Sequence, residues 1–123
     1  HVLEPLNGYL LLGQKMYEEP NRYSEAWNFG PNIEGIVPVW EIGEKIIKNY
    51  GKGSLKDISN PNEVHEAQLL ALDVTKAKFR LNWKPKWNID KTIEKTVEWY
   101  KRYNNEDVYK LCVEQIRNFI ETF

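Results

Sequence analysis

The sequence predicts an α/β chain that is mostly helical, with one or two strands that belong to a larger sheet. Apolar residues recur every three or four positions in four long segments, which is the spacing of amphipathic helices. Residues 26–29 are instead a short apolar run with little alternation, as expected of a strand covered on both faces of a parallel sheet. Because two or three strands alone form a marginal sheet, we expect the 123 residues to be one lobe, and a fragment, of a larger protein.

Two helices are predicted in the first half of the chain. The first begins near Pro5, since proline suits the first helical position, and ends before Pro20 and Asn21. Its positions at helical spacing are Leu6, Tyr9, Leu10, Gly13, Met16 and Tyr17. The second spans residues 38–50 and is capped by Gly51. Its expected inward side chains are Ile42, Ile46 and Ile47.

Short apolar runs between the helices are the candidate strands. The run at 26–29 is followed by a turn at 30–32. Residues 54–58 are compatible with a strand. Residues 69–72 are a better candidate, because they form an apolar run that ends at Asp73. An unpaired strand edge favours association, so we expect the isolated chain to self-associate through 26–29 or to fray there.

Three further helices are predicted in the second half of the chain. Asp73 or Thr75 caps a short helix that ends at Phe79, and Asn88 or Asp90 caps a long one. The inward side chains of the long helix are expected to be Ile89, Ile93, Val97 and Tyr100. The last helix, residues 107–123, carries on its apolar side Val108, Leu111, Cys112, Gln115, Ile116, Phe119 and Ile120.

The charge balance and the single cysteine limit the classes of function. Seventeen basic and 18 acidic side chains leave a net charge of −1, which gives no general attraction to nucleic acid. No apolar run approaches the ~18 residues that span a bilayer. Cys112 cannot form an intramolecular disulfide and suits a reducing compartment, where we expect a buried, inert thiol. We therefore expect a cytoplasmic protein without nucleic-acid or membrane partners.

The usual signatures of cofactor binding and catalysis are missing from the sequence. None of the seven glycines forms a glycine-rich turn between a strand and a helix, and no P-loop is present. His1 and His65 are far apart in sequence, which does not favour a metal site. No tyrosine is followed four residues later by lysine. We therefore predict no catalytic, cofactor-binding or metal-binding residue in these 123 positions.

A few polar and aromatic residues are candidates for binding. His65 and Glu66 precede an apolar run, where they could bind a diphosphate or sugar hydroxyls, or could simply lie in a solvated loop. Glu4, before Pro5, could be no more than a helix cap. The aromatic residues that could stack on a base, or could clamp a loop against a helix, are Trp83, Trp87, Trp99 and Tyr100. We expect Lys84 and Lys86 to lie in a solvated turn.

Four stretches carry a resemblance to a known family. They are HVLEPLNGYLLL (1–12), AWNFGPN (26–32), HEAQLLALDVTKAKFRLNWKPKW (65–87) and EKTVEWYK (94–101). In this order they resemble the carboxy-terminal third of sugar-nucleotide dehydratases and epimerases of the extended short-chain dehydrogenase/reductase family. The resemblance covers nearly the whole chain and weakens after Tyr103.

This resemblance implies a two-part enzyme. An amino-terminal Rossmann domain would bind NAD and carry the catalytic Tyr, Lys and Ser or Thr, while residues 1–123 would form the lobe that closes over a nucleotide sugar. The implied substrate is CDP-glucose, which would be oxidised at C4, dehydrated across C5 and C6, and reduced at C6. We expect the whole parent to be a homo-oligomer, and this chain alone to bind no NAD and to be inert.

The resemblance also assigns four substrate-binding residues. His65 and Glu66 match the loop that faces the diphosphate and the ribose, and His1 lies in a motif whose phosphate-binding arginine is just upstream. Val39 falls near the start of a helix where some relatives place a nucleotide-contacting Asn. Gln68 and Leu70 replace a His and a Tyr of the same strand.

Two alternatives remain open from the sequence. The same lobe could serve a dTDP-, UDP- or GDP-sugar. The chain could also be a non-catalytic helical interaction module that docks through Phe119, Ile120 and Phe123.

Overall fold

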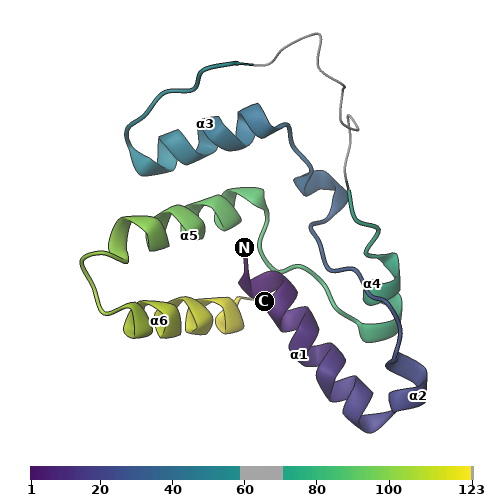
Figure 1. The fold of residues 1–123 in the computed structure, drawn as a ribbon. Coiled ribbons are helices and arrows are strands. Elements are labelled where there is room, and N and C mark those ends of the chain that lie inside the picture. Colours follow the sequence, from purple (N-terminus) through teal and green to yellow (C-terminus); the bar gives the residue numbers. More distant parts are fainter. Residues whose placement is uncertain (59–70, 123) are drawn as a thin grey trace.

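The computed structural model describes residues 1–58 and 71–122, and within these ranges the chain is helical (Figure 1). The elements are α1 (Leu3–Glu18), α2 (Pro20–Tyr23), a 3₁₀ turn η1 (Ile33–Gly35), α3 (Val39–Tyr50), α4 (Thr75–Leu81), α5 (Ile89–Arg102) and α6 (Val108–Glu121). The long helices start and end within a few residues of the predicted positions.

The helices form two groups. Helix α5 packs against both α3 and α6, and α1 packs against both α2 and α4. Figure 1 shows α3, α5 and α6 side by side, with α1, α2 and α4 beside them. Both ends of the described chain reach Trp87, because the His1 ring lies 5.0 Å from its ring and the Thr122 hydroxyl lies 3.1 Å from its indole nitrogen.

The predicted strands at 26–29 and 54–58 are wrong, since neither range forms a strand. Of the candidate strand at 69–72, only residues 71 and 72 are described, and they are not in a strand either. A strand needs a neighbouring backbone to pair with, and the described ranges contain no strand that offers one. Residues 26–29 are instead fixed by their side chains, because Trp27 and Phe29 pack on a buried cluster that includes residues of α4.

Local signals at the helix ends are confirmed. Asn88 accepts a hydrogen bond from the Lys91 N–H at 2.9 Å and caps α5. Asp107 likewise caps α6, accepting from the Lys110 N–H at 3.2 Å. Gly51 ends α3 with a positive φ of 88°, a conformation that glycine adopts at little cost. Pro20 ends α1 as predicted, but it also occupies the first position of α2.

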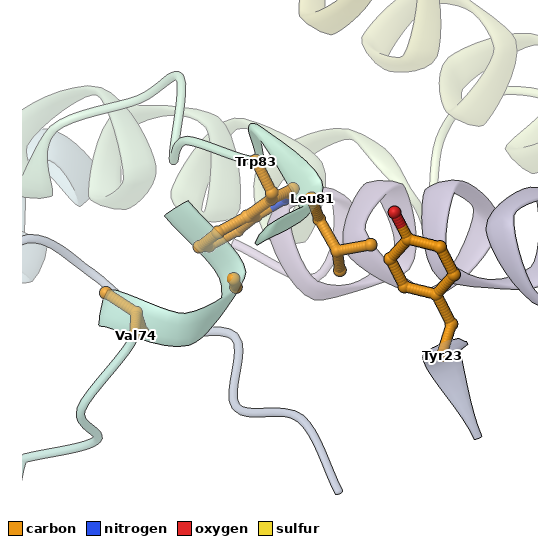
Figure 2. Packing of buried hydrophobic residues seen from close by; sticks show 5 residues of the cluster. Tyr23, Val74, Leu81 and Trp83 are labelled. Carbon is orange, nitrogen blue, oxygen red and sulfur yellow. The ribbon is translucent and has the colours of Figure 1, made fainter. Parts of the chain in front are cut away.

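One buried cluster joins α2 to α4. It consists of Tyr23, Val74, Ala77, Leu81 and Trp83, with Leu11, Leu12, Trp27 and Phe29 packed around it. Figure 2 shows Leu81 between the rings of Tyr23 and Trp83, and Val74 at the far end of the cluster. Trp83 is only 1% exposed, so it anchors the segment that leads from α4 to α5.

A second set of buried side chains lies on α5 and α6, and fewer residues are buried than the sequence predicts. Ile93 and Val97 of α5 are buried, but Tyr100 is 58% exposed. On α6 the buried side chains are Leu111, Gln115 and Phe119, whereas Val108, Ile116 and Ile120 are exposed. No residue of α3 is fully buried, including the three predicted isoleucines.

Arg102 ties the end of α5 to α6. Its guanidinium donates hydrogen bonds to Glu98 on its own helix at 2.7 Å and to Glu106 in the connecting loop at 2.8 Å. It also reaches Glu114 on α6 at 2.8 Å. The bonds to Glu114, Glu106 and Glu98 raise the pKa of Arg102 above its usual range. They also fix the hairpin of α5 and α6, because they join α5, the loop and α6.

Candidate functional site

Three segments that are distant in sequence meet around one cavity of about 580 Å³, which we call the main cavity. Its walls come from the start of α1, the segment at 29–35, and the segment from 85 into the first turn of α5. The lining residues are His1, Val2, Glu4, Pro5, Phe29, Gly30, Pro31, Asn32, Glu34, Gly35, Pro85, Lys86, Trp87, Asn88, Ile89 and Thr92. The volume lies within the range of ~300–1,000 Å³ typical of ligand pockets.

Glu4 connects two of these walls. Its side chain is buried, and Oε1 accepts hydrogen bonds from the backbone N–H of Trp87 at 2.7 Å and of Lys86 at 3.0 Å. Oε2 lies 3.1 Å from the Lys86 N–H. Bonds from N–H groups to a carboxylate are about twice as strong as neutral ones. Glu4 therefore fixes the loop that precedes α5, whereas the N-cap position of α1 belongs to Val2.

Lys84 and Lys86 are both exposed, as expected of a solvated turn, but the Lys86 ammonium is also bound to the protein. Its Nζ donates to the backbone carbonyls of Phe119 at 3.2 Å and Ile120 at 3.1 Å, near the end of α6. A cation at this position satisfies helix-terminal carbonyls and complements the helix dipole. The ammonium also lies 5.3 Å from the centre of the Phe119 ring.

Trp87 is the aromatic centre of the site. It is 6% exposed, and its indole N–H donates to the Thr122 hydroxyl. The Phe119 and His1 rings both meet it edge to face, each with its centroid 5.0 Å away. Trp83 and Trp87 thus clamp the loop against helices, as predicted, whereas Trp99 stacks on Tyr103 at 4.8 Å instead.

The structure brings one of the four predicted site residues into the main cavity. His1 lines it, and its Nδ1 accepts a hydrogen bond from the Leu3 N–H at 3.3 Å. Val39 is the first residue of α3, is 84% exposed and does not line the cavity. His65 and Glu66 lie outside the described residues.

Sequence reasoning missed most of the polar groups that line the main cavity. They are Asn32, Glu34, Lys86, Asn88 and Thr92. Asn88 and Thr92 belong to the amino-terminal end of α5, where helix dipoles favour negative charge. Asn88 was predicted only as a cap, and the other four had no local signal. Together these groups can hydrogen-bond a polar ligand, while the His1 and Trp87 rings supply an apolar surface.

A second hollow of about 450 Å³ lies between α1, α5 and α6. Its lining includes Leu3 and Leu6 of α1, Tyr100 of α5, and Cys112 and Ile116 of α6. The Cys112 thiol is half-buried and unpaired, which agrees only in part with the predicted buried position.

Residues 1–58 and 71–122 contain neither a membrane-crossing helix nor a cluster of metal-binding side chains. No helix there has the length and hydropathy needed to cross a membrane. No group of three or more His, Cys, Asp or Glu side chains in these ranges is arranged to hold a metal ion.

The sequence of the chain is similar to part of two enzymes, a nucleotide-sugar dehydratase and a nucleotide-sugar epimerase. This similarity confirms the predicted resemblance. It is 37% identical over 112 residues to the CDP-glucose 4,6-dehydratase of Salmonella typhimurium (strain LT2), a match that covers 91% of this chain and 31% of the relative. It is 31% identical over 102 residues to UDP-glucose 4-epimerase 2 of Oryza sativa subsp. japonica, covering 80% of this chain and 24% of that protein. The chain thus spans about a quarter to a third of the length of these relatives. No family model matches it.

Proposed function

We propose that the chain is the carboxy-terminal, substrate-binding lobe of a CDP-glucose 4,6-dehydratase. The parent enzyme would convert CDP-glucose to CDP-4-keto-6-deoxyglucose and water with bound NAD. The observation that carries this proposal is the 37% identity to such an enzyme over 91% of the chain. The relative is about three times as long as the matched stretch, which leaves room for a Rossmann domain that binds NAD and carries the reactive groups.

The main cavity supports a binding role. It is lined by residues from three of the stretches that carry the family resemblance, namely 1–12, 26–32 and 65–87. Its polar groups suit the hydroxyls and phosphates of a nucleotide sugar, and its aromatic rings suit a base or a sugar face. Within this proposal His1, Val39, His65 and Glu66 contact the substrate. The parent is a cytoplasmic homo-oligomer.

The test is activity of the full-length protein on nucleotide sugars that differ in their base. We expect the 4-keto-6-deoxy product from CDP-glucose, with a lower kcat/KM for dTDP-, UDP- and GDP-glucose. The isolated chain of 123 residues should give no turnover under the same conditions. Turnover by the isolated chain, or failure of the full-length protein to dehydrate CDP-glucose, would contradict the proposal.

A second candidate function keeps the lobe but changes the nucleotide sugar. The 31% identity to a UDP-glucose 4-epimerase favours it. In the same assay, a preference for UDP-sugars with formation of the C4 epimer would select this candidate.

The interaction-module alternative is weakened by one contact. Phe119, the first residue of the predicted docking face, is 4% exposed and packs on Trp87. Phe123 lies outside the described residues, so Ile120 is the remaining described member of that face.

A further inference from the structure

We propose that Glu4 is a positioning residue for substrate binding, which acts by holding the Lys86–Trp87 backbone as one wall of the main cavity. This inference rests on the proposed function, because the ligand whose affinity it sets is a nucleotide sugar. Glu4 touches the wall rather than the reacting atoms, so it acts through Trp87 and Lys86.

One carboxylate serves two adjacent backbone N–H groups. Oε1 bonds to both Lys86 and Trp87, and Oε2 also lies within reach of the Lys86 N–H. Two successive N–H groups can point at one acceptor only if the backbone between them takes a curved conformation. Glu4 thus selects that conformation from a position 82 residues away in sequence.

The conformation that Glu4 selects determines where two lining side chains lie. From this backbone the Lys86 ammonium reaches the carbonyls at the end of α6, and the Trp87 ring lies between those of Phe119 and His1. The loop has no regular secondary structure between Asn82 and Asn88. The bonds to Glu4 therefore fix the loop from the α1 side, while Lys86 and Trp87 fix it to α6.

Loss of the Glu4 carboxylate should change the shape of the main cavity as well as lower the stability of the fold. Buried N–H groups without an acceptor are costly, so the loop would turn them toward water or toward another acceptor. Either movement displaces the Trp87 ring and changes the shape of the cavity. Substrate affinity should fall, while the chemical step, which we place on another part of the parent, keeps its rate.

The test compares Glu4→Gln and Glu4→Leu with Glu41→Gln in the full-length enzyme. Glutamine keeps one carbonyl acceptor and places an amide near the donors, whereas leucine removes both acceptors. Glu41 is the matched control, because it also lies in the first turn of a helix, α3, and the substitution removes the same charge. We expect Glu4→Gln to raise KM for the nucleotide sugar about tenfold and Glu4→Leu to raise it further, with kcat changed less than about twofold.

A second measurement detects the positioning role without substrate. Near-UV circular dichroism of the ligand-free enzyme should change in Glu4→Gln, and this change should be absent when Trp87→Phe is the background. This measurement needs no substrate, so it shows whether the loop moves even if the enzyme accepts no nucleotide sugar. In that case the proposed function would fail, while the positioning role of Glu4 could still be judged. If the Glu4→Leu variant does not fold, the spectrum of Glu4→Gln still tests the positioning role.

An unchanged KM in folded Glu4→Gln enzyme would overturn the inference, as would an equal rise in Glu41→Gln. An unchanged tryptophan spectrum would overturn it too, since a direct contact between Glu4 and the substrate could then explain a higher KM.

Discussion

Glu25 shows how one exposed carboxylate holds two segments together. It pairs with Lys76 and Arg80 of α4, and both cations lie over the Trp27 ring, 4.5 and 5.2 Å from its centroid. These contacts attach the segment that follows α2 to α4. The hydrogen bonds from Arg80 and then Lys76 lower the pKa of Glu25 from 4.5 to about 2.

This pKa predicts how the stability of the chain depends on pH. The ion pairs of the folded state stabilise the ionised form of Glu25. Its contribution to the free energy of unfolding is therefore fully present above pH 4.5 and is lost as the pH falls toward 2. Thermal unfolding of the wild type and Glu25→Gln at a series of pH values measures it. The difference in Tm should be constant near neutral pH and should shrink between pH 4.5 and about 2.

An Arg80→Leu variant is the control for this prediction. It removes the first of the two partners, so the pKa of Glu25 should be lowered less. The loss of stability should still begin near pH 4.5, but it should be smaller and should be complete at a higher pH than in the wild type. A Tm difference between the wild type and Glu25→Gln that does not change with pH would contradict the role of the ion pairs.

Single residues also mark the limit of what the sequence predicts. Asn88 and Gly51 were identifiable as caps because a cap acts within three or four residues of its own position. The role of Glu4 was not identifiable, because the N–H groups that it binds follow 82 and 83 residues later. The same holds for the Lys86 ammonium, which binds carbonyls 33 and 34 residues away.

At the scale of elements, helices were predictable and strands were not. A helix satisfies its own backbone, so its period and caps appear locally in the sequence, as in α5 and α6. A strand depends on a neighbour, and residues 26–29 and 54–58 find none in the described ranges. The apolar side chains at 26–29 contribute to packing instead of to a sheet, since Phe29 lies against α1 and Trp83.

The contact of α1 with Phe29 requires a glycine at position 8. A Cβ on Gly8 would lie 2.3 Å from Cδ1 of Phe29, whose ring is held edge to face by Trp83 and Tyr9. We expect Gly8→Ala to lower the free energy of unfolding by about 1–3 kcal/mol, because overpacking outweighs the better helix propensity of alanine. Denaturant unfolding of the wild type and the variant measures the change.

Gly13 is the matched control on the same helix. Nothing lies within 4 Å of a Cβ built there, so Gly13→Ala should stabilise the chain by up to about 1 kcal/mol through helix propensity alone. If both alanine variants were stabilising, the close approach of Phe29 to α1 would be incorrect.

At the scale of the whole molecule, the main cavity unites segments that the sequence keeps apart. His1, which the family resemblance predicts to contact the substrate, lines this cavity. Val39 does not line the cavity. The meeting of α1, the 29–35 segment and the loop before α5 depends on long-range packing, which periodicity and local motifs do not encode.

The position of α6 predicts how the site responds to changes near the end of the chain. Truncation after Tyr103 removes the carbonyls that Lys86 binds and the ring that packs on Trp87. We therefore expect the truncated full-length enzyme to lose nucleotide-sugar binding, measured by titration calorimetry. This truncation cannot by itself separate a substrate lobe from an interaction module, because it damages the cavity in either case.

Ile120→Lys separates the two functions. The Ile120 side chain is 62% exposed, its backbone carbonyl remains available to Lys86, and a cation near the end of α6 complements the helix dipole. In a substrate lobe the affinity for the nucleotide sugar should stay within about twofold of the wild type, as for most surface substitutions. A variant that keeps this affinity but loses a protein partner would support the module. A variant that remains folded and yet loses the nucleotide sugar would mean that the exposed face of α6, and not its contact with Lys86 and Trp87, forms the binding site.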